Sequence, residues 1–440
     1  MNILLSIVYA AILFIVSNIH TISDKFNVNI PIWIALVVFI IINIFPSMGQ
    51  KKLETNKLKN CRNGYRLLEI FLISTLFSAI LLLIDIFGYH TDIKIILLNV
   101  LIVYLIELIT FWNGIIRVYI SSKQLGIKHR VIGALVGMIP ILHLIALFKI
   151  IKITKKEVKF ENDKILLNKS RKDEQICKTK YPILLVHGVF FRDSRYFDYW
   201  GRIPKELKDN GATIFYGNHD SAVSIEESAK ELSERIKEIV KQTGCEKVNI
   251  IAHSKGGLDS RCAISEYGMD EYVASLTMIN TPNRGCEFAD YLLGKVPDKV
   301  LNKVANTYNK TLKKLGDKKP DFVSAVKDLT HSFCNDFNNK IKKSDKVYYQ
   351  SVGSKLNTYR GGRFPLNLTN NFVKYFDGAN DGLVGEDSFK YGDKYTFIQH
   401  EGKRGISHGD MIDLNRENID GFDVREFFVK LVSELREKGF

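Results

Sequence analysis

Hydrophobic residues are spread very unevenly along this chain. Long apolar runs fill the first 150 residues, at 3–19, 30–45, 67–87, 93–120 and 131–151. Most of these runs approach the roughly 20 residues that a helix needs to cross a bilayer. The pattern predicts an all-α transmembrane domain over residues 1–151 with about five helices, or four if the first two runs form a hairpin. The last run contains Gly133, Gly137 and Pro140, so a kinked or re-entrant segment is the alternative there.

The charges between the apolar runs predict the orientation of this domain. Segments 47–66 and 117–130 are rich in Lys and Arg and should face the cytoplasm, whereas 88–92 carries neither residue and should face outward. Counting helices then places the chain after the last run outside the cell membrane. Lysines within 149–159 favour the cytoplasm instead. The prediction leans slightly to an extracytoplasmic C-terminal domain on a multi-pass membrane protein.

One carboxylate interrupts the fourth apolar run. Glu107 lies in the middle of that run, where an ionisable residue is rare and is a functional candidate. A neutral or hydrogen-bonded Glu that faces other helices, near His143, is the simpler interpretation. Nothing else in the domain indicates a transporter or a channel, so we expect it to act as an anchor.

The hydrophobic pattern changes after the apolar leader. Residues 152–180 form a polar, lysine-rich stretch that we interpret as a basic linker. From 181 to 440, strand patterns alternate with helix patterns, which predicts an α/β fold with a doubly wound, mostly parallel sheet and helices on both faces. A helical insertion at about 298–343 breaks this alternation and forms either a lid over the site or a peripheral helix pair. Ligands of such sheets bind at the carboxyl ends of the strands.

The net charge and the cysteine content limit which binding partners and which stabilising sites the chain can have. The formal net charge is +14, which indicates anionic partners. Many lysines flank apolar segments, and no arginine-rich stripe is interleaved with aromatic residues. Anionic lipid is therefore favoured over nucleic acid. The six cysteines are scattered without metal-ligand spacing, which argues against a disulfide scaffold and a zinc site. The sequence predicts no particular oligomeric state.

A serine stands at a predicted turn between a strand and a helix. The apolar run 248–252 leads into His253-Ser254-Lys255-Gly256-Gly257. Small residues two positions before and after the serine, Ala252 and Gly256, let strand and helix pack closely around a strained turn. This is the G-x-S-x-G pattern with Ala at its first position, although a Ser beside Gly is also typical of an ordinary turn or helix cap.

A serine nucleophile requires a base and a residue that orients the base. Candidate acids after Ser254 are Asp377, Asp381, Asp387 and Asp393, and the histidines beyond them are His400 and His408. The chain order Ser, acid, His favours Asp381 in its Asn-Asp-Gly turn and His408 in a Gly-flanked loop. An Asp-Gly pair is also typical of a β-turn, and His408 of a helix entry. The backbone N–H groups of Lys255 and Val189 are the expected oxyanion donors.

Taken together, these motifs resemble those of bacterial triacylglycerol lipases of the α/β-hydrolase family, including clostridial lipase-like proteins. The resemblance covers about 181–440 and rests on five segments: Leu185-Val186-His187-Gly188, Ala252-His253-Ser254-Lys255-Gly256-Gly257, Thr281-Pro282-Asn283-Arg284-Gly285, Asn380-Asp381-Gly382-Leu383-Val384 and Ser407-His408-Gly409-Asp410. It implies Ser254 as nucleophile, Asp381 as acid and His408 as base. It also implies Val189 and Lys255 as oxyanion donors, an ester substrate with long acyl chains, and a mobile lid.

The sequence departs from the family's usual residues at two positions. It also does not decide whether the structural calcium of the family is bound. The family usually has His where Asn283 stands, and often Gln or Met where Lys255 stands. Many members bind a structural calcium through an Asp two residues after the catalytic His, which matches Asp410. No second carboxylate ligand is evident upstream, and no other cofactor is expected.

These observations predict a membrane-anchored serine esterase or lipase that hydrolyses carboxylic esters of lipids through an acyl-enzyme. An acyltransferase that uses the same triad is one alternative. A membrane sensor or interaction protein with a catalytically silent hydrolase fold is another, and the retained Ser, Asp and His speak against it.

Overall fold

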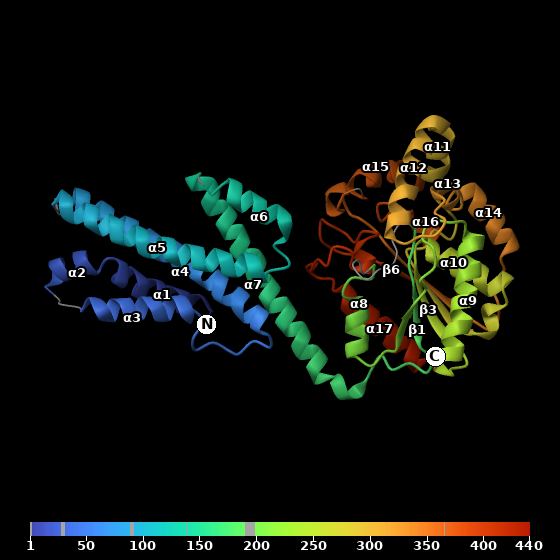
Figure 1. The fold of residues 1–440 in the computed structure, drawn as a ribbon, viewed down its shortest axis with the longest axis horizontal. Coiled ribbons are helices and arrows are strands. Elements are labelled where there is room, and N and C mark those ends of the chain that lie inside the picture. The colour runs from blue at the N-terminus through green and yellow to red at the C-terminus, as the bar shows by residue number, and fades with distance from the viewer. Residues whose placement is uncertain (1, 28–30, 89–91, 138, 190–198, 365) are drawn as a thin grey trace. The chain divides into compact units, whose positions relative to one another are not determined.

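The computed structural model describes the chain except for residues 1, 28–30, 89–91, 138, 190–198 and 365 (Figure 1). The described residues form two compact units, Met1–Lys169 and Ser170–Phe440. The boundary falls inside the stretch that we predicted as a linker. Residues 152–170 of that stretch continue the helix α7 (Pro140–Ser170), because their Lys, Glu and Leu residues are good helix formers and the helix does not end where the apolar run ends.

The first unit is helical. Its helices are α1 (Asn2–Ser17), α2 (Ile19–Phe26), α3 (Ile32–Ile44), α4 (Asn56–Phe87), α5 (Ile93–Ser121), α6 (Gly126–Leu135) and α7. Helices α4 and α5 cross closely where Gly64 faces Gly114, since a Cβ at Gly64 would lie 2.9 Å from the Gly114 carbonyl oxygen. Small residues at a helix crossing let the two backbones approach, as is common within membranes.

Fewer helices than predicted are long enough to span a bilayer. Within the described ranges, α4 and α5 have the length and apolar composition to cross one, and α1 with α2 would form a third span if the 77° bend between them is counted as a break in one span. The last predicted run is divided between α6 and α7, so the kinked alternative describes it better than a continuous span. The first unit is therefore a helical region with two long candidate spans rather than five.

Glu107 lies inside this unit, as the simpler interpretation expected. Its side chain is buried, and it lines a cavity of about 400 Å³ together with His143. The same cavity is lined by Phe71, Asn99 and Phe111. The carboxylate of Glu107 is therefore enclosed by the neighbouring helices of this unit.

The second unit is built on a six-stranded parallel sheet with the order β2-β1-β3-β4-β5-β6. The strands are β1 (Ile183–Val186), β2 (Ile214–Tyr216), β3 (Val248–His253), β4 (Val273–Ile279), β5 (Tyr348–Ser354) and β6 (Lys394–Ile398). All five neighbouring pairs are parallel. The predicted parallel sheet of an α/β fold is confirmed.

Two apolar cores lie on the two faces of this sheet. Helices α9 (Ile225–Thr243), α10 (Lys255–Glu266) and α14 (His331–Lys340) pack on one face, and α8 (Ile203–Asp209) and α17 (Val424–Glu437) pack on the other (Figure 1). Alternate residues of β1 point to opposite faces, Leu184 to the first core and Leu185 to the second. Burial on both faces explains why the strands are continuous apolar runs in the sequence.

Long helical segments connect the later strands. Between β4 and β5 the chain forms α11 (Glu287–Lys295), α12 (Asp298–Leu315), α13 (Phe322–Lys327) and α14. The last three lie within the predicted insertion at 298–343, and α11 precedes it. Between β5 and β6 it forms α15 (Leu366–Asp377) and α16 (Glu386–Phe389). These segments leave the sheet at the carboxyl ends of its strands, where the candidate site residues also lie.

Candidate functional site

Ser254 lies at the sharp turn between β3 and α10. Its backbone has φ 56° and ψ −131°, a left-handed conformation that is rare for a residue with a side chain. The Ser254 N–H is held by the Ile279 carbonyl oxygen of β4 at 3.0 Å. Any side chain on Gly256 would collide with the His187 carbonyl oxygen. The strained turn and its glycine are the features expected of a serine nucleophile between a strand and a helix.

Asp381 and His408 are in direct contact. The distance between His408 Nδ1 and Asp381 Oδ2 is 2.6 Å, and the Asp381 carbonyl oxygen also accepts the His408 backbone N–H at 2.9 Å. Asp381 is completely buried. Its Oδ1 accepts the backbone N–H groups of Leu383 and Val384, each at 2.9 Å. These bonds fix the carboxylate with Oδ2 toward the His408 ring, so that it can orient the imidazole.

The His408 ring lies next to the residue that precedes Ser254. The rings of His253 and His408 have centroids 4.4 Å apart, and His253 Nε2 donates to the His408 carbonyl oxygen at 3.2 Å. No hydrogen bond joins the Ser254 hydroxyl to His408 in the described part of the chain. Such bonds are often long without substrate and tighten when it binds. The structure therefore brings Ser254 and the Asp381–His408 pair to one edge of the sheet.

Tyr199 connects the expected oxyanion loop to this cluster. Its hydroxyl accepts the Gly188 N–H at 2.9 Å and donates to His253 Nδ1 at 2.7 Å. Burial lowers the pKa of His253 well below its usual range, which keeps the ring neutral with Nδ1 as acceptor. Gly188 is tightly placed, since a Cβ there would lie 2.8 Å from Ser254 Cβ. The loop after β1 is thus fixed close to the serine.

The two expected oxyanion donors lie at strand ends on the same edge. Lys255 is the first residue of α10, where backbone N–H groups have no intrahelical partner. Val189 follows β1 and packs against Ala222, Leu312 of α12 and Ala325 of α13. The helices of the insertion therefore reach the oxyanion loop. Residues 190–198, the continuation of that loop, lie outside the described residues.

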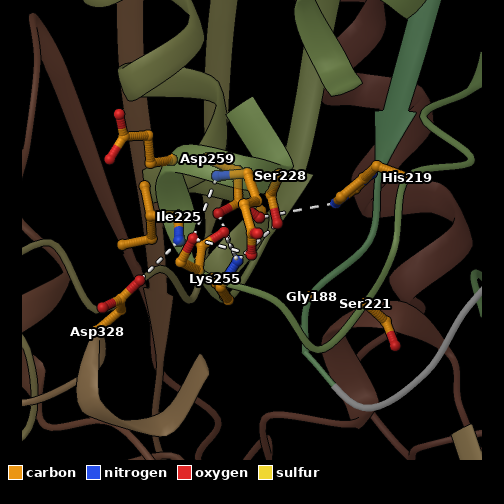
Figure 2. A network of polar contacts seen from close by, with 12 residues as sticks. Gly188, His219, Ser221, Ile225, Ser228, Lys255, Asp259 and Asp328 are labelled. Atoms are coloured by element: carbon orange, nitrogen blue, oxygen red, sulfur yellow. Dashed lines mark hydrogen bonds and ion pairs between the residues drawn. The ribbon is translucent and has the colours of Figure 1, made fainter. Parts of the chain in front are cut away.

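The side chain of Lys255 is buried in a separate polar network (Figure 2). Lys255 Nζ donates to Asp259 Oδ1 at 2.7 Å and to Ser228 Oγ at 2.9 Å. Asp259 Oδ2 lies 3.6 Å from His219 Nε2. Burial raises the pKa of Asp259 to about 6, and the nearby Lys255 ammonium limits this rise. Asp259 is thus paired with Lys255 and does not contact Asp381 or His408 among the described residues.

The other candidate acids and His400 have separate partners. Asp377 accepts the N–H of Glu287 at the start of α11, at 3.0 Å. Asp393 pairs with Lys343, and Asp387 is exposed. His400 donates to the Asp420 carbonyl oxygen at 2.6 Å. Among the candidate acids and histidines that follow Ser254 in the sequence, only Asp381 and His408 share a hydrogen bond in the described structure.

Sequence reasoning missed Asn280 and Tyr199. Asn280 has a left-handed φ of 47°, and its amide donates to Asp381 Oδ2 at 2.6 Å and to Ser354 Oγ at 2.8 Å. Its position directly after β4 was a signal, because polar residues at strand ends collect at the site edge. Tyr199 lies in an aromatic-rich loop, and no local pattern in the sequence separates it from its neighbours.

The surroundings of Asp410 do not fit a calcium ion. Its two carboxylate oxygens accept from the Arg404 guanidinium at 2.6 and 2.9 Å. Oδ2 also accepts the Ser407 N–H at 2.8 Å. Calcium needs six to eight oxygen ligands, and the described residues contain no group of three or more His, Cys, Asp or Glu side chains that could hold a metal. An arginine occupies the carboxylate that was the candidate calcium ligand.

Comparison with known proteins agrees with this architecture. Residues 181–376 match the model of the alpha/beta hydrolase fold. A 119-residue segment is 38% identical to a triacylglycerol lipase of Pseudarthrobacter phenanthrenivorans, over 26% of this chain and 37% of that protein. A triacylglycerol lipase of Burkholderia plantarii is also 38% identical over 119 residues, 26% of this chain and 33% of that protein. The matches thus span little more than a third of these bacterial relatives.

Other similarities extend over more of the chain at lower identity. Triacylglycerol lipase 2 of Saccharomyces cerevisiae is 27% identical over 288 residues, which is 61% of this chain and 79% of the yeast protein. The crystal structure of Staphylococcus hyicus lipase is 18% identical with a TM-score of 0.47, over 59% of this chain and 97% of that one. Residues 181–376 of the C-terminal unit thus match the alpha/beta hydrolase fold, and the helical region before that unit contains two candidate membrane spans.

Proposed function

We propose that this protein is a membrane-anchored serine esterase or lipase that hydrolyses carboxylic esters of lipids. The observation that carries the proposal is the 2.6 Å contact between Asp381 and His408, next to a serine in a strained strand–helix turn. The similarity to triacylglycerol lipases supports an ester substrate. The length and apolar character of α4 and α5 support a membrane anchor.

In the proposed reaction, Ser254 Oγ attacks the acyl carbonyl carbon while His408 Nε2 accepts the hydroxyl proton. Asp381 stabilises the resulting imidazolium through Nδ1. The N–H groups of Val189 and Lys255 donate to the oxygen that becomes negative. The tetrahedral intermediate then expels the alcohol, which takes the proton from His408, and leaves an acyl-serine. Water activated by His408 attacks this ester, releases the carboxylic acid and restores the serine.

The helical insertion is the proposed lid of this site. Leu312 and Ala325 pack with Val189, and the backbone N–H of Ser221 is held by Asp317 Oδ2 at 3.1 Å. Helices α12 and α13 therefore lie over the oxyanion loop. Opening them would give a long acyl chain access to Ser254.

The test is hydrolysis of p-nitrophenyl esters by the full chain and by Ser254→Ala. We expect turnover in the wild type and its loss in the variant, because the nucleophile is removed. A fluorophosphonate probe should label the wild type and not Ser254→Ala. A folded wild type that neither turns over esters nor reacts with the probe would contradict the proposal and favour a catalytically silent protein. Added alcohols that accept the acyl group in preference to water would instead identify an acyltransferase.

A further inference from the structure

The C-terminal unit contains a cavity whose lining is strongly basic. It has a volume of about 290 Å³ and is lined by Arg261, Asn283, Arg284, Asn338, Ile341, Lys342, Lys343, Lys390 and Tyr391. Five of these lining residues are Arg or Lys, and no Asp or Glu is among them. We refer to this cavity as the basic pocket. None of its lining residues belongs to the proposed Ser254 site.

The innermost cation of the basic pocket is Arg261 of α10, which is only 2% exposed. Its guanidinium donates to Asn283 Oδ1 at 3.2 Å and to Asn338 Oδ1 at 2.7 Å. It also stacks on the Tyr391 ring, with Cζ 3.8 Å from the ring centroid. Both hydrogen-bond acceptors are neutral amides. No carboxylate pairs with this buried positive charge in the described residues.

Arg261 also keeps an unused donor. Its buried Nε has no hydrogen-bond partner within the described part of the chain. Leaving a buried charge without a counter-ion and a buried N–H without an acceptor is costly. A bound anion at the basic pocket would supply the missing counter-ion.

The exposed rim of the basic pocket adds further positive charge. Arg284, Lys342 and Lys390 are exposed, and none of them forms an ion pair among the described residues. Lys343 differs from them because it already pairs with Asp393. Four cations, including Arg261, thus converge on the cavity without a carboxylate partner. This excess of charge suits an anion with more than one negative charge.

We propose that the basic pocket binds a phosphate group that carries a small organic substituent. Arginine forks match the oxygens of phosphate, and flexible lysines add point charges. The cavity lies near the lower end of the ~300–1,000 Å³ typical of small-molecule sites. It therefore has room for a phosphate and a short substituent. The phosphate belongs either to a free phosphomonoester or to a lipid head group, and the chemistry of recognition is shared.

Titration of the full chain in detergent tests this proposal. The soluble probes are inorganic phosphate and glycerol 3-phosphate, with acetate as a singly charged comparison. The lipid probes are ether-linked phosphatidic acid and ether-linked phosphatidylcholine in mixed micelles, which contain no carboxylic ester to hydrolyse. Binding is measured by calorimetry, and folding of each variant is checked by its thermal midpoint.

Lys342→Gln/Lys390→Gln removes two exposed cations from the basic pocket without disturbing a buried contact. Lys230→Gln/Lys237→Gln is the matched control, since both lysines are exposed on α9. We expect phosphate binding to weaken at least tenfold in the first variant and to stay unchanged in the control. Binding of glycerol 3-phosphate would identify a free phosphomonoester, and binding of phosphatidic acid alone would identify a lipid head group.

Three results would overturn the proposal. The first is no saturable binding of any phosphate-containing probe. The second is an equal loss of binding in the pocket variant and the control, which would indicate a general charge effect. The third is acetate binding as tightly as phosphate, which would exclude selectivity for a multiply charged anion.

Discussion

The two oxygens of the Asp381 carboxylate have different partners: Oδ1 bonds to the backbone of its own turn, and Oδ2 contacts His408. Oδ1 fixes the turn through the N–H groups of Leu383 and Val384, and Oδ2 accepts from His408 and Asn280. A neutral amide at this position could still fill the space. In the proposed reaction, however, it could not stabilise the imidazolium that would form when His408 takes the Ser254 proton.

We therefore predict that Asp381→Asn lowers kcat for ester hydrolysis by about 10³–10⁴-fold, with a much smaller effect on KM. Steady-state kinetics with a p-nitrophenyl ester measure both constants. Asp387→Asn is the matched control, because Asp387 is exposed and lies outside the cluster. Comparable losses in the two variants would argue that Asp381 has no special role.

The buried pair of Lys255 and Asp259 gives a pH-dependent prediction. The pKa of Asp259 is raised from 3.8 to about 6 in the folded chain. Between these values the folded state binds a proton that the unfolded state does not, so Asp259 favours folding more as pH falls. Relative to Lys255→Met/Asp259→Leu, the wild type should gain about 1 kcal/mol of stability between pH 7 and pH 5.

Thermal midpoints of the two proteins at pH 7 and pH 5 measure this gain. The double variant is the reference because it replaces the ion pair with apolar residues and removes the Asp259 carboxyl group. A difference in midpoint that is the same at both pH values would contradict the raised pKa.

At the scale of elements, the close approach of α10 to β1 depends on Gly256. A Cβ at this position would lie 3.0 Å from the Val186 carbonyl oxygen and closer still to that of His187. Backbone atoms of a buried strand cannot move aside cheaply. The helix and its serine would both shift away from the oxyanion loop.

Gly256→Ala should therefore destabilise the C-terminal unit by about 1–3 kcal/mol and reduce ester hydrolysis. Gly294→Ala is the matched control, since a Cβ at Gly294 of α11 meets nothing within 4 Å. Alanine is also the better helix former. Thermal midpoints and ester turnover of the two variants test the difference, and a harmless Gly256→Ala would mean that the contact can relax.

Some elements could be predicted from consecutive residues in the sequence, and others could not. The Ser254 turn was predictable because strand, serine and glycines are consecutive in the sequence. Chain order was enough to single out Asp381 and His408, which the structure brings into contact. Asn280 and Tyr199 were not found, because their roles depend on contacts between distant segments. The break between α6 and α7 was only one of two alternatives, because apolar composition alone does not show where a helix bends.

At the scale of the whole molecule, the cysteines offer a way to determine which side of the membrane carries the C-terminal unit. All six are free thiols, and Cys245 is the one that is not buried. Cys61, which lies in α4 before the apolar run 67–87, is only 1% exposed and would react poorly. Cys245 is therefore the natural reporter.

We predict that an impermeant maleimide labels Cys245 in intact cells, as an extracytoplasmic C-terminal unit requires. Cys245→Ser should remove the label, because the remaining thiols are buried. Mass spectrometry of the labelled peptide measures the result. Labelling that appears only after the cells are permeabilised would place the unit in the cytoplasm.

The position of the inserted helices has a consequence for how such proteins diversify. Helices α11 to α14 leave the sheet after β4 and return before β5, so one contiguous stretch of chain forms much of the cover over the strand ends. Helix α14 also packs in the core against the sheet, so the part that can be exchanged without disturbing the strand before Ser254 is α11 to α13. In the proposed esterase, exchanging these three helices between homologues would transfer preferences for acyl groups while the chemistry beneath stays unaltered.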